Sequence, residues 1–157
     1  MIEKIKALVM DVDGTLTDGG LYIGEDGELM KRFHVKDGYA IHDILPQMGI
    51  IPIIITGRTS KIVLRRCKEL GIIRVVQGSR DKVQDLKRIL EIEKISLEET
   101  AYIGDDLNDL NCMQIVGLKG CPQDAVMEIK KIADYITSSN GGNGAVREFI
   151  EWIGKRN

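Results

Sequence analysis

The run IIPIIIT, residues 50–56, restricts the possible folds more than any other stretch of the chain. It is apolar at nearly every position, which is typical of a central strand buried on both faces of a sheet. Pro52 cannot donate a hydrogen bond to a neighbouring strand, so the residue at which this strand begins stays open. A strand buried on both faces needs helices on both sides, which indicates an α/β fold.

Short β-rich runs alternate with helical patterns through the rest of the chain, as in a parallel sheet covered by helices. Strands are expected at Ile5–Met10, Ile50–Thr56, Arg74–Gln77, Ala101–Gly104, Leu118–Gly120 and Tyr135–Ile136. Apolar residues at helical spacing predict helices near 41–48, 62–70 and 83–90, with later helices at Asp109–Ile115, Gln123–Ile132 and Ala145–Ile153. The pattern predicts one domain over residues 1–157, a three-layer Rossmann-like parallel sheet flanked by helices.

An insertion at about residues 20–34 interrupts the alternation after the first strand. Leu21–Ile23 and Glu28–Phe33 flank the turn GEDG, which predicts a β-hairpin. The insertion is too short for a cap domain, and only a few residues separate Leu70 from the third strand. We therefore expect a capless fold that ends in a glycine-containing C-terminal tail at about 138–157.

Composition excludes several classes of partner. A net charge of −2 and 4% aromatic residues argue against nucleic-acid binding. No stretch approaches the roughly 18 apolar residues that a membrane span requires, so we expect no membrane partner. Cys67, Cys112 and Cys121 lack metal-binding spacing, which indicates free thiols in a reducing cytoplasm.

Polar side chains follow four consecutive predicted strands. They are Asp11 and Asp13 after the first strand, Thr56 and Arg58 after the second, Lys82 after the third, and Asp105, Asp106 and Asp109 after the fourth. Parallel strands bring such residues together at the carboxyl edge of the sheet. Carboxylates there favour Mg²⁺, and a carboxylate nucleophile would split phosphoester hydrolysis into two steps through an aspartyl-phosphate. Thr56 could then hydrogen-bond the phosphoryl group, and Lys82 could offset charge on the nucleophile.

The motifs DVDGT, the Thr of TGR, the Lys of SRDK and GDDLND occur in this order, each after a predicted strand. In this the chain resembles the haloacid dehalogenase superfamily of phosphatases over nearly its whole length. The resemblance implies Asp11 as nucleophile and Asp13 as acid/base. It also implies Mg²⁺ held by Asp11, the Asp13 backbone carbonyl and Asp105, with Asp106 and Asp109 supporting these ligands.

The segments FHVKDGYAI, ITGR, RRCKELGI and GGNGAVRE are similar to those of capless phosphatases that act on 3-deoxy-D-manno-octulosonate 8-phosphate in lipopolysaccharide biosynthesis. This implies a homotetramer in which a neighbouring subunit covers the site and the C-terminal tail can reach into one. It also implies a substrate-contacting loop over residues 34–38. The implied substrate contacts are Asp13, His34, Val35, Lys36, Asp37, Gly38, His42, Arg58, Arg66 and Lys82. His42 departs from the pattern, because relatives place a longer cationic residue there.

Other interpretations stay open. His42 could be an exposed helical histidine, Arg66 part of a solvated charge run, and NGGNG an ordinary loop. A phosphorelay receiver would place its acceptor aspartate after the third strand, where this chain reads VVQGSR. A non-catalytic binding relative, or a phosphatase for a nine-carbon sugar acid phosphate or another small phosphosugar, are the further alternatives.

Overall fold

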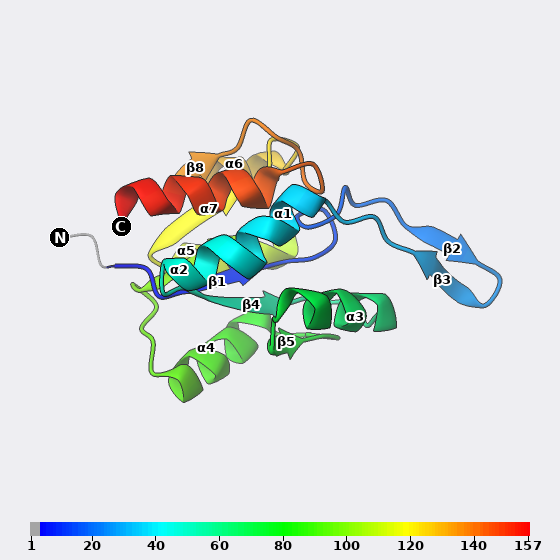
Figure 1. Cartoon of the computed structure of the whole chain (residues 1–157), viewed down its shortest axis with the longest axis horizontal. Coiled ribbons are helices and arrows are strands. Elements are labelled where there is room, and N and C mark those ends of the chain that lie inside the picture. Colours follow the sequence, from blue (N-terminus) through cyan, green and yellow to red (C-terminus); the bar gives the residue numbers. More distant parts are fainter. Residues whose placement is uncertain (1–3) are drawn as a thin grey trace.

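The computed structural model describes residues 4–157, with six strands in one parallel sheet (Figure 1). These strands are β1 (Ala7–Met10), β4 (Ile51–Ile55), β5 (Arg74–Val76), β6 (Thr100–Ile103), β7 (Leu118–Cys121) and β8 (Tyr135–Ile136). Their order is β5-β4-β1-β6-β7-β8, so the chain winds outward from β1 through β4 to β5 and then returns to β1's other side. All five pairings are parallel, which confirms the predicted sheet.

Pro52 lies inside β4 at a position where its missing N–H is tolerated. Ile51 donates its backbone N–H to Lys6 on the β1 side, so the next residue's nitrogen faces β5. Pairing with β5 begins only at Ile53, one residue later. The proline therefore removes no bond from the ladder, and the strand begins at Ile51.

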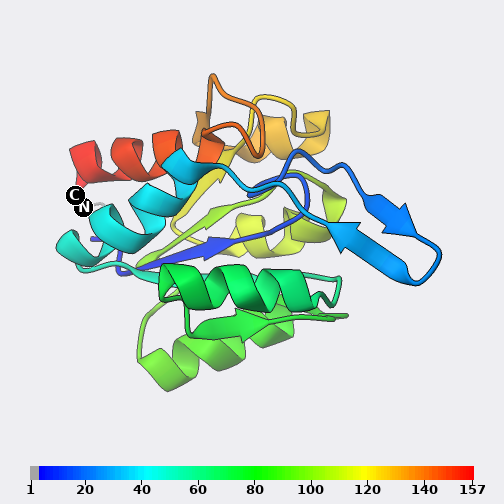
Figure 2. The ribbon, with the colours of Figure 1, turned by 45° about the vertical axis from the view of Figure 1, so that its right-hand side comes forward.

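Helices cover both faces of the sheet (Figure 2). One face is covered by α1 (Val35–Tyr39), the π-helical turn η1 (Ala40–Ile44), α2 (Leu45–Gln47), α3 (Lys61–Leu70) and α7 (Ala145–Arg156). The other is covered by α4 (Lys82–Glu93), the 3₁₀ turn η2 (Leu107–Asp109), α5 (Leu110–Ile115) and α6 (Met127–Ile132). Leu8 and Met10 face the first layer, and Ala7 and Val9 face the second. The period-two alternation of β1 thus fills two separate cores.

The predicted hairpin is present as β2 (Tyr22–Gly24) and β3 (Gly27–Met30), and it forms a separate two-stranded sheet. It projects from the body of the molecule in both ribbon views (Figures 1 and 2). Several of its apolar side chains are exposed, including Ile23 and Leu29 at 57% and 68%. The hairpin therefore adds little to the core of a single chain.

Two expectations require correction. Residues 35–38, expected as a loop, form the first turn of α1, because the His34 side chain caps the helix by accepting a hydrogen bond from the Lys36 N–H. The helix predicted at Ala145–Ile153 is present as α7, which buries Phe149, Ile150 and Ile153 completely and occupies most of the segment expected as the C-terminal tail. α6 also begins at Met127 and not at Gln123.

The glycine-containing loop at 138–144 docks on residues 14–18 of its own chain, which follow β1. Gly142 donates its N–H to the Thr15 carbonyl at 3.1 Å, and Arg32 donates to the Gly142 carbonyl at 2.9 Å. A Cβ on Gly141 would lie 2.0 Å from the Gly14 carbonyl oxygen. Only glycine permits this approach, so the loop supports the segment that follows β1.

Candidate active site

Asp11 and Lys82 meet at the carboxyl edge of the sheet, as the strand order predicts. Asp11 follows β1 and Lys82 begins α4, and their side chains are both 6% exposed. Lys82 Nζ lies 3.2 Å from Asp11 Oδ1 and 2.9 Å from Asp109 Oδ1. One buried ammonium therefore bridges two buried carboxylates.

Asp109 is fully buried, and both of its oxygens already have donors. Oδ1 accepts from Lys82 and from the Tyr102 hydroxyl at 2.6 Å. Oδ2 accepts from the backbone N–H groups of Asp105 and Asp106. These bonds hold Asp109 in a supporting position, from which it orients Lys82 and the turn that carries Asp105.

Asp11, Asp105 and Asp109 each bring a carboxylate oxygen within 4.8 Å of the other two. Asp105 Oδ1 also accepts a hydrogen bond from the Thr15 hydroxyl at 3.0 Å. Asp106 caps the η2 turn and lines the adjoining cavity. Because Asp109 is saturated by donors, Asp11 and Asp105 are the members of this group with capacity for a cation.

Burial and carboxylate crowding shift the pKa values of this cluster. Burial, followed by repulsion from Asp109, raises the pKa of Asp11 well above its ordinary value. The same two causes raise the pKa of Asp105 to about 6. Burial lowers the pKa of Lys82, but Asp11 and Asp109 outweigh it and leave the pKa raised. A divalent cation beside Asp11 and Asp105 would relieve the repulsion, so the cluster fits Mg²⁺.

Asp13 turns its carboxylate toward the hairpin and pairs with a residue that the sequence patterns did not single out. Lys31 Nζ lies 2.6 Å from Asp13 Oδ1 and 3.0 Å from Glu28 Oε2. Burial lowers the pKa of Lys31, but the bonds to Asp13 and Glu28 outweigh it, so the net pKa is raised. Lys31 belongs to no recognised motif, and the only signal in the sequence was a lysine at the end of a predicted hairpin strand.

A single open cavity joins most of the predicted catalytic residues. It is lined by Asp11, Asp13, Thr56, Gly57, Arg58, Asp105, Asp106 and Asn108. Thr56 is buried at the end of β4, where its backbone is fixed by bonds to Val76 and Ser79. Arg58 lies two residues further and is the one predicted sugar-acid contact outside the catalytic set that lines this cavity.

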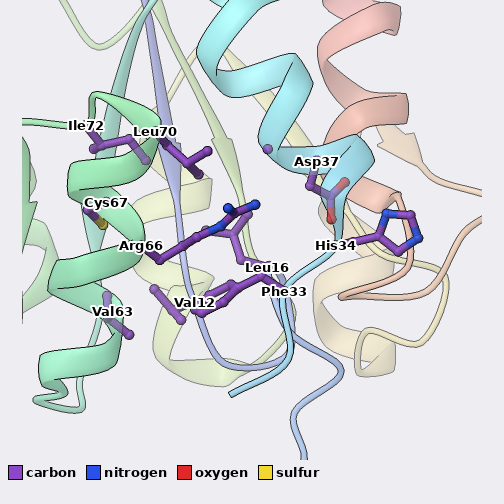
Figure 3. Close-up of a pocket in the computed structure, with 11 residues that line it drawn as sticks. Val12, Leu16, Phe33, His34, Asp37, Val63, Arg66, Cys67, Leu70 and Ile72 are labelled. Atoms are coloured by element: carbon purple, nitrogen blue, oxygen red, sulfur yellow. The ribbon is translucent and has the colours of Figure 1, made fainter. Parts of the chain in front are cut away.

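Other predicted substrate contacts line a second, mostly apolar cavity between α1 and α3 (Figure 3). His34, Asp37, Gly38 and Arg66 belong to it, and Figure 3 shows Arg66 reaching from α3 toward the start of α1. A Cβ on Gly38 would lie 2.4 Å from an Arg66 nitrogen, so glycine permits this approach. Within residues 4–157, Asp37 Oδ2 and Arg66 Nε are buried polar atoms without a hydrogen-bond partner.

Asp37 also has a structural role, because its Oδ1 accepts the Arg147 N–H near the start of α7 at 2.9 Å. Val35 and Lys36 are exposed on α1. His42 lies on the outer side of η1, with its side chain 54% exposed and 3.3 Å from Asp43. Within one chain, these contacts therefore lie away from the cavity that holds Asp11.

A doubly wound parallel sheet with a buried Asp–Lys cluster at its switch point is typical of α/β proteins that bind a ligand at the carboxyl edge of the sheet. The model of the haloacid dehalogenase-like hydrolases matches residues 68–150, more than half of the chain, and the chain belongs to this family.

Three similar proteins are named as phosphatases of one type. The chain is 45% identical over 151 residues to the 3-deoxy-D-manno-octulosonate 8-phosphate phosphatase KdsC of Escherichia coli, which covers 96% of this chain and 80% of that protein. The corresponding crystal structure from Yersinia pestis superposes with a TM-score of 0.91 at 42% identity, over 95% of this chain and 80% of that one. The enzyme from Moraxella catarrhalis, solved with magnesium, phosphate and KDO, gives 0.91 at 44% identity, over 96% and 86%.

Proposed function

We propose that this protein is a Mg²⁺-dependent phosphatase that converts 3-deoxy-D-manno-octulosonate 8-phosphate to the free sugar acid and phosphate, in lipopolysaccharide biosynthesis. The observation that carries the chemistry is the buried Asp11–Lys82–Asp109 cluster beside Asp105 and Asp13. The substrate rests on 45% identity over 96% of the chain to an enzyme named for it.

Asp11, Asp105 and the Asp13 backbone carbonyl would hold the metal ion. Bound there, Mg²⁺ supplies charge neutralisation between the substrate phosphate and the carboxylates. Two features support this assignment: the oxygens of Asp11 and Asp105 lie close together, and burial raises the pKa of both groups.

The chain's own residues account for the two chemical steps. Asp11 attacks phosphorus, and Asp13 acts as the general acid that supplies a proton to the leaving alcohol oxygen as the phosphorus–oxygen bond breaks. Asp13 then takes a proton from the water that hydrolyses the aspartyl-phosphate. Lys82 stabilises the charge on Asp11, and Thr56 offers its hydroxyl to the phosphoryl group.

Selection among phosphoesters must come from contacts with the sugar acid. Arg58 lines the catalytic cavity and can bind a carboxylate with two hydrogen bonds. Arg66 and Asp37 present unpartnered buried polar atoms in the second cavity. In an oligomer, Arg66 and Asp37 would face the active site of a neighbouring subunit, where they would contact the sugar acid.

We propose a homotetramer acting in the cytoplasm. The hairpin supports assembly, because Leu21, Tyr22, Ile23, Leu29 and Met30 are exposed on it and would be buried by a neighbouring hairpin. In support of the location, the cysteines at 67, 112 and 121 are free and buried, and within residues 4–157 no helix is long and apolar enough to cross a membrane. Light scattering that reports an active monomer at micromolar concentration would refute the tetramer.

The substrate is tested by comparing kcat/KM for the eight-carbon sugar acid phosphate, its nine-carbon relative and a neutral hexose phosphate. We expect the eight-carbon acid to be preferred over the hexose phosphate by roughly 10²-fold or more, because a cation built to bind a carboxylate is left unpaired by a neutral sugar. Equal rates for the two would indicate a general phosphatase, and a preference for the nine-carbon acid would change the substrate.

Arg58→Ala should reduce this preference more than it slows a small aryl phosphate. Arg65→Ala is the matched control, since Arg65 is an exposed arginine on α3 with its side chain 85% accessible. If Arg58→Ala slows both substrates equally, Arg58 binds the phosphate and not the sugar acid.

A further inference from the structure

The hairpin carries one charged side chain that is buried where its apolar neighbours are exposed. The Lys31 side chain is 2% exposed although the residue as a whole is only half-buried, whereas Leu29 and Met30, directly before it, are exposed residues. Lysine is almost never buried without a paired carboxylate, and large apolar residues usually take the buried positions. This reversal indicates that the end of β3 is arranged around the lysine's contacts.

Those contacts form a continuous chain from α3 to Asp13. The Ser60 hydroxyl donates to Glu28 Oε1, and Glu28 Oε2 binds Lys31 at 3.0 Å. Lys31 then binds Asp13 Oδ1 at 2.6 Å. Ser60 is itself fixed, since it caps α3 and donates its N–H to the Gln77 side chain at 2.8 Å. Ser60, Glu28 and Lys31 are therefore each held by contacts on two sides.

We propose that Lys31 is a positioning residue for Asp13, and that Glu28 and Ser60 hold Lys31 in place. The inference rests on the proposed phosphatase function. Because Lys31 engages Asp13 Oδ1, Oδ2 is the oxygen left free to face the leaving group. As the Asp11–phosphorus bond forms and the phosphorus–oxygen bond to the sugar breaks, the bonding electron pair stays on the leaving oxygen and the proton that Asp13 supplies joins it.

The consequence is a selective effect on substrates whose leaving group needs that proton. An alkoxide is a poor leaving group and requires a general acid, whereas p-nitrophenolate leaves readily without one. A lysine that merely stabilised the fold or bound the phosphate would affect both substrates alike. The ratio of the two activities therefore separates positioning of the acid from these other roles.

The experiment measures kcat/KM for the sugar acid phosphate and for p-nitrophenyl phosphate, in Mg²⁺, for wild type, Lys31→Met, Lys31→Arg and Glu28→Gln. We expect Lys31→Met to lose roughly 10²-fold on the sugar phosphate and less than about fivefold on the aryl phosphate, mainly in kcat. Lys31→Arg should recover part of the loss, and Glu28→Gln should show the same selectivity at roughly tenfold. Asp13→Asn supplies the reference pattern.

Glu25→Gln is the matched control for Glu28→Gln, because Glu25 lies exposed at the turn of the same hairpin. Equal losses on both substrates, or no loss in Lys31→Met, would overturn the positioning role while leaving the phosphatase proposal intact. A wild-type protein that hydrolyses neither substrate would overturn both. If Lys31→Met does not fold, Lys31→Arg and Glu28→Gln decide the question by the same ratio.

Discussion

The two aspartates of DVDGT are each paired with a lysine, but the two lysines come from very different parts of the molecule. Lys82 begins α4 inside the body of the fold, where Asp11 and Asp109 both bind it. Lys31 reaches Asp13 from a hairpin that projects away from that body (Figure 1). The proposed nucleophile, Asp11, is therefore held by the edge of the sheet, and the proposed acid/base, Asp13, is held by an inserted hairpin.

This difference indicates that the parallel sheet and the inserted hairpin contribute separately to the site. The nucleophile cluster depends on parallel strands that end together, which any member of the fold class provides. The acid/base side depends on the hairpin of β2 and β3, whose exposed side chains add little to the core of the chain. We expect changes on the Lys82 side to affect all substrates and changes on the hairpin side to affect only some.

Removal of the nucleophile gives the largest effect. Asp11→Asn should lower kcat by at least about 10⁴-fold for every phosphomonoester, because an amide cannot form the aspartyl-phosphate. The fold should persist, since the amide replaces a carboxyl group whose pKa burial raises, and Lys82 keeps Asp109. Phosphate release and circular dichroism check this, and turnover within tenfold of wild type would refute the assignment of Asp11.

Lys82→Met tests the Asp11–Lys82–Asp109 cluster at the edge of the sheet. It leaves Asp11 and Asp109 buried without their shared cation, which should destabilise the metal-free protein by about 3 kcal/mol. We expect kcat to fall by roughly 10²–10³-fold on sugar and aryl phosphates alike. Thermal melts and both assays measure the two effects. Lys87→Met, an exposed lysine on the same helix, should leave both unchanged, and a selective loss on one substrate would contradict the comparison.

The loop at 138–144 packs against residues 14–18, which lie between Asp13 and the hairpin. A substitution at Gly142 would strain this contact. At its φ of +72°, a Cβ would lie 2.4 Å from the Asp18 nitrogen. Gly142→Ala should therefore lower stability by about 2 kcal/mol and the melting temperature by roughly 5 °C. Gly49→Ala is a matched control, with a φ of +71° and nothing within 4 Å of its Cβ. If both variants lose the same stability, backbone conformation alone explains the effect and the close contact does not.

The sequence predicted the site best where local pattern and strand order agree. Asp11, Thr56, Lys82 and Asp105 each follow a strand, and the parallel sheet brings their side chains together. Lys31 could not be found in this way, because its partner lies 18 residues away across a hairpin whose orientation depends on packing. The helical conformation of residues 35–38 was missed because Gly38 weakens the helical pattern, while the His34 cap and the Asp37 contact with α7 stabilise it.

The smallest expected effect is a pH dependence of stability, and it tests only the buried carboxylate cluster that contains Asp105. The pKa of Asp105 is about 6 in the folded chain, above its ordinary value of 3.8, because burial and Asp109 disfavour the charged form. The folded state therefore binds this proton more tightly than the unfolded state does. In the metal-free protein, the stability contributed by this proton is complete below pH 3.8 and is lost as the pH rises through 6. Mg²⁺ competes with the same proton, so its stabilising effect should increase with pH.

The measurement is the rise in melting temperature that saturating Mg²⁺ produces at pH 5.5 and at pH 7.5. We expect a rise of a few degrees at pH 7.5 and about half of it at pH 5.5, because part of Asp105 is protonated at the lower pH. Asp105→Asn should remove most of the rise and its pH dependence, since the amide does not titrate. Asp106→Asn, at the neighbouring residue that caps η2, should retain both. An equal rise at the two pH values in the wild type would mean that Asp105 does not exchange its proton for the metal ion, and the buried cluster would then have to bind Mg²⁺ through other oxygens.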